Sequence, residues 1–201
     1  MNARIAARQD TRQLLLEAGA EVMIEKGYTN SGIQEVLSKV GVPKGSFYHY
    51  FDSKEDFALA IIDEFHKEFM AFLMPILTDK SLTPVQRMRT YCETKRECMR
   101  AAKCRKGCLI GNLSQEMSDQ SETLRQALSE VMDKRVHAFA ACIEEGQHLG
   151  EITDAADAGK IADLFSSCWE GALMRAKTSK DVEPLNVFIE LIFELVLKNR
   201  S

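Results

Sequence analysis

The stretch VLSKVGVPKGSFYHYF, residues 36–51, has the spacing of a short helix, a tight turn and a second short helix. The apolar residues that recur at i, i+3, i+4 and i+7 before the turn are Ile33, Val36, Leu37 and Val40. This spacing predicts one apolar helix face. Gly41 suits a left-handed position just after a helix end, and Pro43 suits a first helical turn because it has no backbone N–H. We expect the second helix to run from Lys44 to about Tyr50.

At about 100° per residue, the second helix has an aromatic side and a compact polar side. The aromatic side contains Phe47, Tyr50 and Phe51, and the polar side contains Gly45, Ser46, Tyr48 and His49. A helix that enters a major groove about 12 Å wide needs short or flat residues and donors on its outer face. We predict that Gly45 allows close approach and that Lys44 reaches a base edge or phosphate, while Tyr48 and His49 donate to phosphates. The pattern alone also fits an ordinary helical hairpin with an aromatic core.

Residues on either side of this stretch extend the predicted surface. Ser31 followed by Gln34 predicts a capping box, and the free amides at that helix start can hold a phosphate. Lys54 follows Ser53, a predicted helix cap, and is placed for a further phosphate contact. Residues 1–9 are expected to form a flexible arm whose Arg4 and Arg8 touch DNA, or to be a solvated terminus.

This stretch and its flanks resemble the DNA-binding domain of TetR-family transcriptional repressors. The residues that carry the resemblance are Thr29, Ser31 and Gly32, the run from Val42 to Phe51, and Ser53, Lys54 and Glu55. The resemblance implies an all-helical homodimer that binds a palindromic DNA operator and releases it when a small molecule or chemical signal reaches the C-terminal domain. The expected DNA-binding residues are Thr29, Ser31, Lys44, Gly45, Ser46, Tyr48, His49 and Lys54.

Composition agrees with a globular protein, since 45% of the 201 residues are hydrophobic and 28% are charged. The net charge is −4, but residues 1–54 hold seven Lys/Arg against six Asp/Glu, so the acidity lies in the rest of the chain. No secretory signal or membrane span is visible. We expect a cytoplasmic protein whose six cysteines are thiols.

Helical periodicity and capping signals continue to the C-terminus, with no strand pattern. They predict helices at about 11–26, 54–73, 84–102, 109–117, 122–146, 154–177 and 185–198, with Pro75 breaking the pattern. The fold class is therefore all-α with about nine helices, divided into a helix-turn-helix domain at 1–52 and a sensing and dimerisation domain at 53–201. The last helix is apolar nearly all round, which predicts that it is covered by a second subunit or by intramolecular core.

Cys108 is a candidate sensor because Arg105 and Lys106 precede it and a helix starts beside it, and both features favour the thiolate. The run from Gly107 to Glu116 is similar to a segment in the branch of TetR regulators that includes the N-ethylmaleimide reductase repressor. That resemblance implies that Cys108 senses reactive electrophiles, helped by Lys177 as a nearby cation. The alternative is that Cys108 is a small buried residue.

A non-covalent apolar inducer is the competing mechanism, because the family encloses its ligand with helices of the C-terminal domain. The candidate lining residues are Tyr91, Leu113, Phe139 and Trp169, with Glu116 and His137 as groups that orient a ligand. No cofactor or metal site is predicted, since cysteines six residues apart on a helix do not converge. No nucleophile elbow or glycine-rich phosphate loop indicates an enzyme. A more distant alternative is a helical interaction protein that does not bind DNA.

Overall fold

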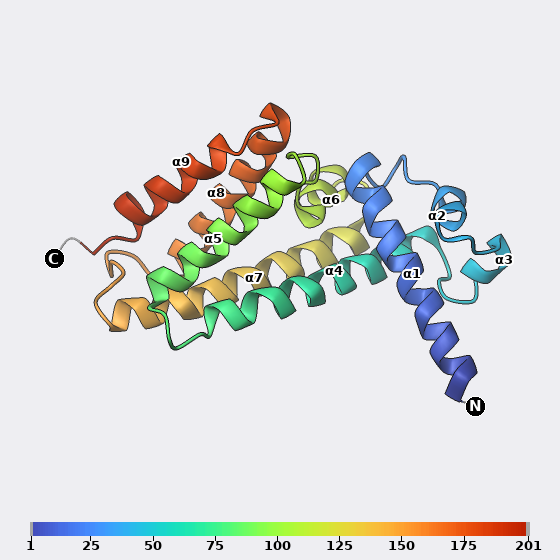
Figure 1. Cartoon of the computed structure of the whole chain (residues 1–201), viewed down its shortest axis with the longest axis horizontal. Coiled ribbons are helices and arrows are strands. Elements are labelled where there is room, and N and C mark those ends of the chain that lie inside the picture. The colour runs from blue at the N-terminus through green and yellow to red at the C-terminus, as the bar shows by residue number, and fades with distance from the viewer. Residues whose placement is uncertain (1, 200–201) are drawn as a thin grey trace. The chain divides into compact units, whose positions relative to one another are not determined.

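The computed structural model describes the backbone of residues 2–199 and the side chains of residues 11–199. Within that part of the chain the fold is all-α, as predicted, with one isolated extended pairing between Ile152 and Lys198. The helices in Figure 1 are α1 (Asn2–Lys26), α2 (Ile33–Val40), α3 (Lys44–Phe47), α4 (Lys54–Leu77), α5 (Pro84–Ala101), α6 (Leu109–Met117), α7 (Glu122–His148), α8 (Ala158–Ser179) and α9 (Glu183–Leu191). A π-helical turn, η1 (Ile192–Val196), follows α9.

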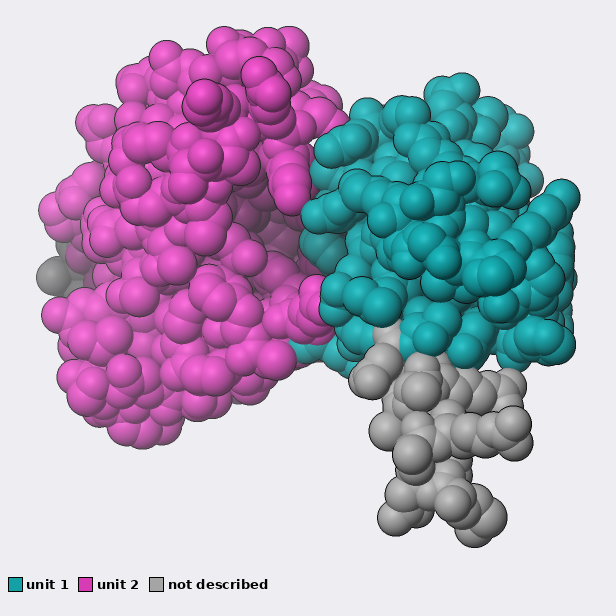
Figure 2. All heavy atoms as spheres, turned by 45° about the vertical axis from the view of Figure 1, so that its right-hand side comes forward, with its two compact units in different colours: residues 1–67, 109–131 teal, residues 68–108, 132–201 magenta. Residues whose placement is uncertain are grey.

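The chain divides into two compact units (Figure 2). Unit 1 contains residues 1–67 and 109–131, and unit 2 contains residues 68–108 and 132–201. Unit 1 is larger than the segment 1–52 that the sequence predicts, because it includes α6 and the first parts of α4 and α7. Residues 1–52 remain our proposed DNA-binding segment, and unit 1 is the compact body that contains it.

Several predicted helix ends are confirmed. Gly41 has φ of 69° and ψ of 26°, the left-handed conformation in which a residue without Cβ ends a helix at little cost. Thr83 forms a complete capping box with Gln86 at the start of α5. The Ser53 hydroxyl accepts from the Asp56 amide at 3.0 Å, which caps α4.

Other local predictions are wrong. The first helix begins at Asn2, so residues 2–9 are helical and not a flexible arm, while the side chains of Arg4 and Arg8 lie outside the described residues. Pro75 lies inside α4, which continues to Leu77. The last predicted helix is interrupted, since α9 ends at Leu191 and the chain continues as a π-turn.

The core of unit 1 is aromatic where α3 meets α4. Phe47 is fully buried, and its ring lies edge-on to Phe57 with centroids 5.1 Å apart. Phe51 packs against Phe57 at 4.7 Å. Helix α3 ends at Phe47, so the predicted extension to about Tyr50 is wrong. Because α3 is only four residues long, these ring contacts and not helix propensity hold it in place.

Unit 2 has a core formed by the second part of α4 and by α5, α7, α8 and α9. Its buried apolar side chains include Leu73, Met88, Phe139, Phe165, Trp169, Leu185 and Phe188. Arg87, near the start of α5, joins this core. Its side chain is 2% exposed, and its guanidinium pairs with the Glu145 carboxylate on α7 at 2.9 Å. The pairing satisfies a buried charge that is costly when left alone.

Candidate functional site

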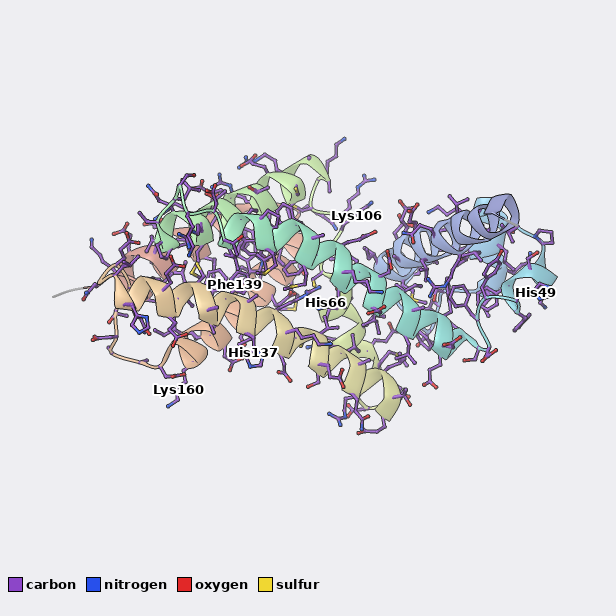
Figure 3. All side chains as sticks on the ribbon, turned by 90° about the horizontal axis from the view of Figure 1, so that it is seen from below. His49, His66, Lys106, His137, Phe139 and Lys160 are labelled. Carbon is purple, nitrogen blue, oxygen red and sulfur yellow. The ribbon has the colours of Figure 1, made fainter. Side chains whose placement is uncertain are left out.

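The polar side of α3 is accessible, as the sequence predicts. Lys44, Gly45, Tyr48 and His49 are exposed, and Ser46 is half-buried. Figure 3 shows His49 at the periphery of its segment, directed away from the ribbon. The Tyr48 ring lies edge-on to Phe47 with centroids 5.4 Å apart, which holds an exposed ring in one orientation. This face therefore combines a cation, donors and an uncovered backbone.

Gly45 leaves the surface of α3 open. A Cβ built at this position meets no atom of the chain within 4 Å. The absence of a side chain is therefore not required by packing within this protein. It is consistent with close approach by another molecule.

Ser31 has a structural role within the protein that its sequence did not indicate. It is 2% exposed, and its hydroxyl donates to the Tyr28 carbonyl oxygen at 2.7 Å. Its amide donates to the same carbonyl at 3.2 Å. Helix α2 is capped by Gly32 without a side-chain hydrogen bond, so the predicted Ser31–Gln34 capping box is wrong. We leave Ser31 out of the proposed DNA contacts.

The turn between α1 and α2 is held by Glu116 of α6. One carboxylate oxygen of Glu116 accepts from the Tyr28 amide at 2.7 Å, and the other accepts from the Thr29 amide at 2.7 Å. Burial opposes ionisation, but hydrogen bonds from Thr29 and Tyr28 outweigh it and hold the pKa of Glu116 below its ordinary value. Glu116, which its sequence context suggested as a group that orients a ligand, thus fixes a turn in unit 1.

Lys54 contributes to the same turn. Its ammonium lies 4.5 Å from the centroid of the Tyr28 ring and donates to the Thr29 carbonyl at 3.3 Å. Burial lowers the pKa of Lys54, and the nearby Glu116 carboxylate opposes that shift. Of the predicted contacts, Thr29 and Lys54 therefore shape the turn, and the exposed residues of α3 form the outer surface.

In unit 2 the structure brings Cys108 against two charged residues that the sequence analysis missed. Cys108 is half-buried directly before α6, and the Arg135 guanidinium of α7 lies 3.5 Å from its sulfur. The Cys108 thiol also hydrogen-bonds to the carboxylate of Glu170 on α8. The cation beside the sulfur is thus Arg135 and not one of its sequence neighbours, Arg105 and Lys106, which are exposed.

A signal for Arg135 was present in the sequence. Arg135 occupies an inner position of α7, on the stripe that contains the buried residues Leu128, Val131, Phe139 and Cys142. A single charged residue at an inner helical position indicates a buried partner or a function. Arg135 is 7% exposed and its guanidinium carbon lies 4.0 Å from the centroid of the Phe69 ring.

A second cation lies in the same region. The Lys95 ammonium of α5 is 4.2 Å from the centroid of Phe72 and 5.5 Å from that of Phe69. Burial lowers the pKa of Lys95, and Arg135 lowers it further while the cysteines Cys98 and Cys108 oppose the shift. Lys95 and Arg135 thus both lie over aromatic rings in this part of unit 2.

The predicted ligand-lining residues fall into two groups. Tyr91, Phe139 and Trp169 meet in unit 2, with the Tyr91 ring 5.1 Å from Phe139 and 5.8 Å from Trp169 by centroids. Each is 3% exposed, and burial raises the pKa of Tyr91 well above its ordinary value. Leu113 is buried on α6 and belongs to unit 1. In Figure 3 Phe139 lies among the helices, whereas His137, which is exposed, lies at the edge of α7.

Lys177 is half-buried on α8. It lies seven residues beyond Glu170, about 10 Å further along the helix axis at 1.5 Å per residue. Glu170 is the α8 residue that interacts with Cys108 here, and the predicted role of Lys177 as a nearby cation stays a prediction.

The described residues also carry information about other kinds of site. All six cysteines lie within them and are free, with Cys98 and Cys168 exposed. No group of three His, Cys, Asp or Glu side chains in residues 11–199 could hold a metal ion. Across the same part of the chain, no helix has the length and apolar character needed to cross a membrane.

An N-terminal unit with an exposed helix-turn-helix, continued by a larger helical unit, defines a class of DNA-binding regulators. Comparison with known proteins identifies the family. Residues 15–61 match the family described as bacterial regulatory proteins, tetR family, and residues 84–192 match the tetracyclin repressor-like C-terminal domain. The chain belongs to the TetR family and is a DNA-binding transcriptional regulator.

The chain is similar to named regulators over nearly its whole length. It is 37% identical to the HTH-type transcriptional repressor DhaR of Mycobacterium sp. (strain GP1), over 95% of this chain and 94% of the relative. It is 40% identical to the transcriptional regulator AcuR of Cereibacter sphaeroides, over 88% and 80% of the two chains. A crystal structure of Escherichia coli NemR in its reduced form matches with a TM-score of 0.85 and 28% identity, over 95% of this chain and 100% of that one.

Proposed function

We propose that this protein is a homodimeric repressor that binds a palindromic operator through α3 and is released when a reactive electrophile modifies Cys108. The observation that carries the proposal is the position of Cys108, half-buried between the Arg135 guanidinium and the Glu170 carboxylate. A cation 3.5 Å from the sulfur stabilises the negative charge that makes a cysteine nucleophilic. Family membership supports the DNA-binding part of the proposal.

The proposed DNA contacts are the exposed residues of α3 and the turn that follows. Lys44 supplies a cation and Gly45 an uncovered backbone, while Tyr48 and His49 supply donors for phosphates. Replacing both Tyr48 and His49 by Ala is expected to weaken binding to all DNA sequences, because phosphate contacts carry no sequence information. Replacing Lys44 is expected to alter sequence preference if it reads a base edge.

The proposed dimer interface is the outer face of α8 and α9, which pack against each other. Apolar side chains are exposed on α8, on α9 and on the π-turn that follows α9: Leu164 is 48% exposed, Val187 44%, Leu191 45% and Leu195 56%. In a water-soluble protein, exposed apolar side chains that share one face indicate an interface. The family resemblance favours a second copy of this chain as the partner.

A charge placed in this face tests the dimer. Leu191→Arg together with Leu195→Arg is expected to give a monomer by sedimentation at micromolar concentration and to weaken operator binding, because one subunit contacts only one half-site. Leu149→Arg is the matched control, since Leu149 is 63% exposed and lies outside α8 and α9. A monomeric unmodified protein would contradict the proposal.

The chain offers a route from the sensor to the DNA-binding segment. Helix α6 begins at Leu109, the residue after Cys108, and it contains Glu116, which fixes the Tyr28 and Thr29 amides. We propose that modification of Cys108 shifts α6 and thereby favours dimers whose recognition helices no longer match major grooves about 34 Å apart. Base contacts are then lost together, while weak electrostatic binding persists.

The deciding experiment is a binding titration against the DNA upstream of the gene for this protein, at fixed salt, before and after treatment with a thiol-specific electrophile. Loss of tight binding in the unmodified protein and its retention in Cys108→Ser support the proposal. The exposed Cys98 provides a matched control as Cys98→Ser, which should still release DNA. Tight binding that survives treatment contradicts the covalent mechanism and favours a non-covalent apolar inducer.

A further inference from the structure

The cations of unit 1 differ in whether the protein itself holds them. The structure describes seven Lys and Arg side chains in this unit, namely Arg12, Lys26, Lys39, Lys44, Lys54, Lys67 and Arg125. A cation that is paired with a carboxylate has much of its field cancelled, so it attracts a DNA phosphate less than a cation that faces water. The partners of these side chains therefore separate structural charges from charges that are available to DNA.

Five of the seven cations are engaged within unit 1. Four form ion pairs with carboxylates, each with an N–O distance of 2.6 Å: Lys26–Glu35, Lys39–Glu21, Lys67–Asp63 and Arg125–Glu122. The fifth, Lys54, donates to the Thr29 carbonyl oxygen and lies over the Tyr28 ring. These five charges serve contacts inside the protein.

Lys44 and Arg12 are the remaining two cations. Both are exposed, and within the described part of unit 1 neither is paired with a carboxylate. Lys44 already belongs to the proposed DNA-binding surface, because it begins α3. Arg12 lies on a different helix, α1.

Arg12 is joined to the α3 region through Phe51. Its guanidinium carbon lies 5.4 Å from the centroid of the Phe51 ring. That ring packs against Phe47 of α3 with centroids 5.3 Å apart, and Phe47 in turn contacts the exposed Tyr48 ring. The Arg12 cation is therefore attached to the same aromatic cluster that positions the exposed face of α3. A guanidinium over an aromatic ring keeps its charge and its N–H donors for a further partner.

We propose that Arg12 is a further DNA-binding residue, which contacts a backbone phosphate next to the groove that α3 enters. Phosphate suits a guanidinium because two parallel N–H groups can donate to two phosphate oxygens. Such a contact fixes the orientation of the protein on the duplex and reads no base. The inference rests on the proposed DNA-binding surface of α3, and it is independent of the proposed role of Cys108.

A phosphate contact by Arg12 predicts a defined salt dependence. Each phosphate that a protein cation neutralises releases counterions, so log K changes with log salt concentration with a slope of about −0.9 per contact. A homodimer carries Arg12 twice, and removal of both charges should make the slope less steep by about 1.8. At about 0.15 M salt this change corresponds to roughly 30-fold weaker binding, which should be equal for all DNA sequences.

The experiment measures binding of the full-length protein to two duplexes over a series of salt concentrations. One duplex is the DNA upstream of the gene for this protein, and the other has the same length and a shuffled sequence. Arg12→Met removes the charge but keeps an apolar stem over Phe51, whereas Arg12→Lys keeps the charge. Arg12→Gln is a second charge-free variant, so the test does not depend on how methionine packs. Arg125→Met is the matched control, because Arg125 is an exposed arginine of the same unit that is paired with Glu122.

Arg12→Met and Arg12→Gln are expected to flatten the salt slope by about 1.8 on both duplexes. Arg12→Lys and Arg125→Met should keep the slope of the unsubstituted protein. A structural role of Arg12 alone would lower thermal stability and leave the slope unchanged. Thermal unfolding of the same samples therefore separates the two roles.

The inference is overturned if both charge-free variants keep the salt slope of the unsubstituted protein, or if Arg125→Met flattens it equally. It is also overturned if the loss of affinity is confined to one of the two duplexes, because a phosphate contact acts on every sequence. These results leave the proposed function intact. Failure of the proposed function is a different result, in which replacing Tyr48 and His49 by Ala weakens binding to neither duplex.

Discussion

Glu116→Gln is the substitution that most directly probes how α6 controls the DNA-binding segment. Each carboxylate oxygen of Glu116 accepts a hydrogen bond from one backbone N–H, of Tyr28 or Thr29, at 2.7 Å. A glutamine side chain has only one acceptor oxygen. One of the two N–H groups would then face an NH₂ donor. A hydrogen bond to a charged group contributes about 1.5–3 kcal/mol, and partial exposure places this one near the lower end. We expect a cost of about 2 kcal/mol.

Hydrogen exchange measures this cost at the residues concerned. A loss of about 2 kcal/mol corresponds to roughly 30-fold faster exchange of the Tyr28 and Thr29 amides, provided that exchange occurs through local opening. Operator affinity should fall as well, because this turn leads directly into α2. Amides in the core of unit 2 should keep their exchange rates.

The control for Glu116→Gln is Glu122→Gln, which removes a surface carboxylate of the same unit that pairs with Arg125. It should leave exchange at Tyr28 and Thr29 unchanged. Unchanged exchange of these two amides in Glu116→Gln would refute the reasoning, since it would mean that the carboxylate is not what protects them. Equal acceleration in both variants would refute it too.

Three further predictions follow from local geometry. Gly27→Ala should destabilise unit 1 more than Gly41→Ala in thermal unfolding, because both have positive φ but only at Gly27 would a Cβ meet a Glu116 oxygen, at 2.5 Å. Gly45→Ala should leave thermal stability equal or slightly higher yet weaken operator binding, because a Cβ there meets nothing in the protein and helix propensity improves. Hydrogen bonds from Arg87 lower the pKa of Glu145 from 4.5 to about 2. This pair should therefore stabilise the fold above pH 4.5 and lose its contribution as the pH falls toward 2. In Glu145→Gln, the free energy of unfolding should not show this loss between pH 4.5 and 2.

Local features of the chain were enough to predict much of the fold. The existence and the C-terminal end of helix α2 were predicted correctly, because apolar periodicity marks its face and Gly41 marks its end. Helix α6 was predicted at its observed bounds. The exposed side of α3 and the turn after it followed from helical geometry, because Phe47 and Phe51 are buried and Tyr48 and His49 lie on the other side.

Prediction failed where a local signal competed with packing. Ser31 and Gln34 have the spacing of a capping box, but the Ser31 hydroxyl is closer to a carbonyl of the turn and donates to it. Pro75 reads as a break, yet α4 passes through it, because neighbouring apolar residues such as Leu73 and Leu77 are buried on the same helix. Packing free energy outweighs one lost hydrogen bond in such a place.

The contacts that matter most for the proposed function connect residues far apart in the chain. Cys108 could be singled out from its sequence neighbours, but its partners Arg135 and Glu170 are 27 and 62 residues away and depend on how α7 and α8 pack. Glu116 contacts amides 87 and 88 residues earlier. Helix periodicity and capping depend on residues within a few positions of each other, so they can be predicted from the sequence. Pairings between helices arise only when buried faces meet, and the tertiary structure alone decided them.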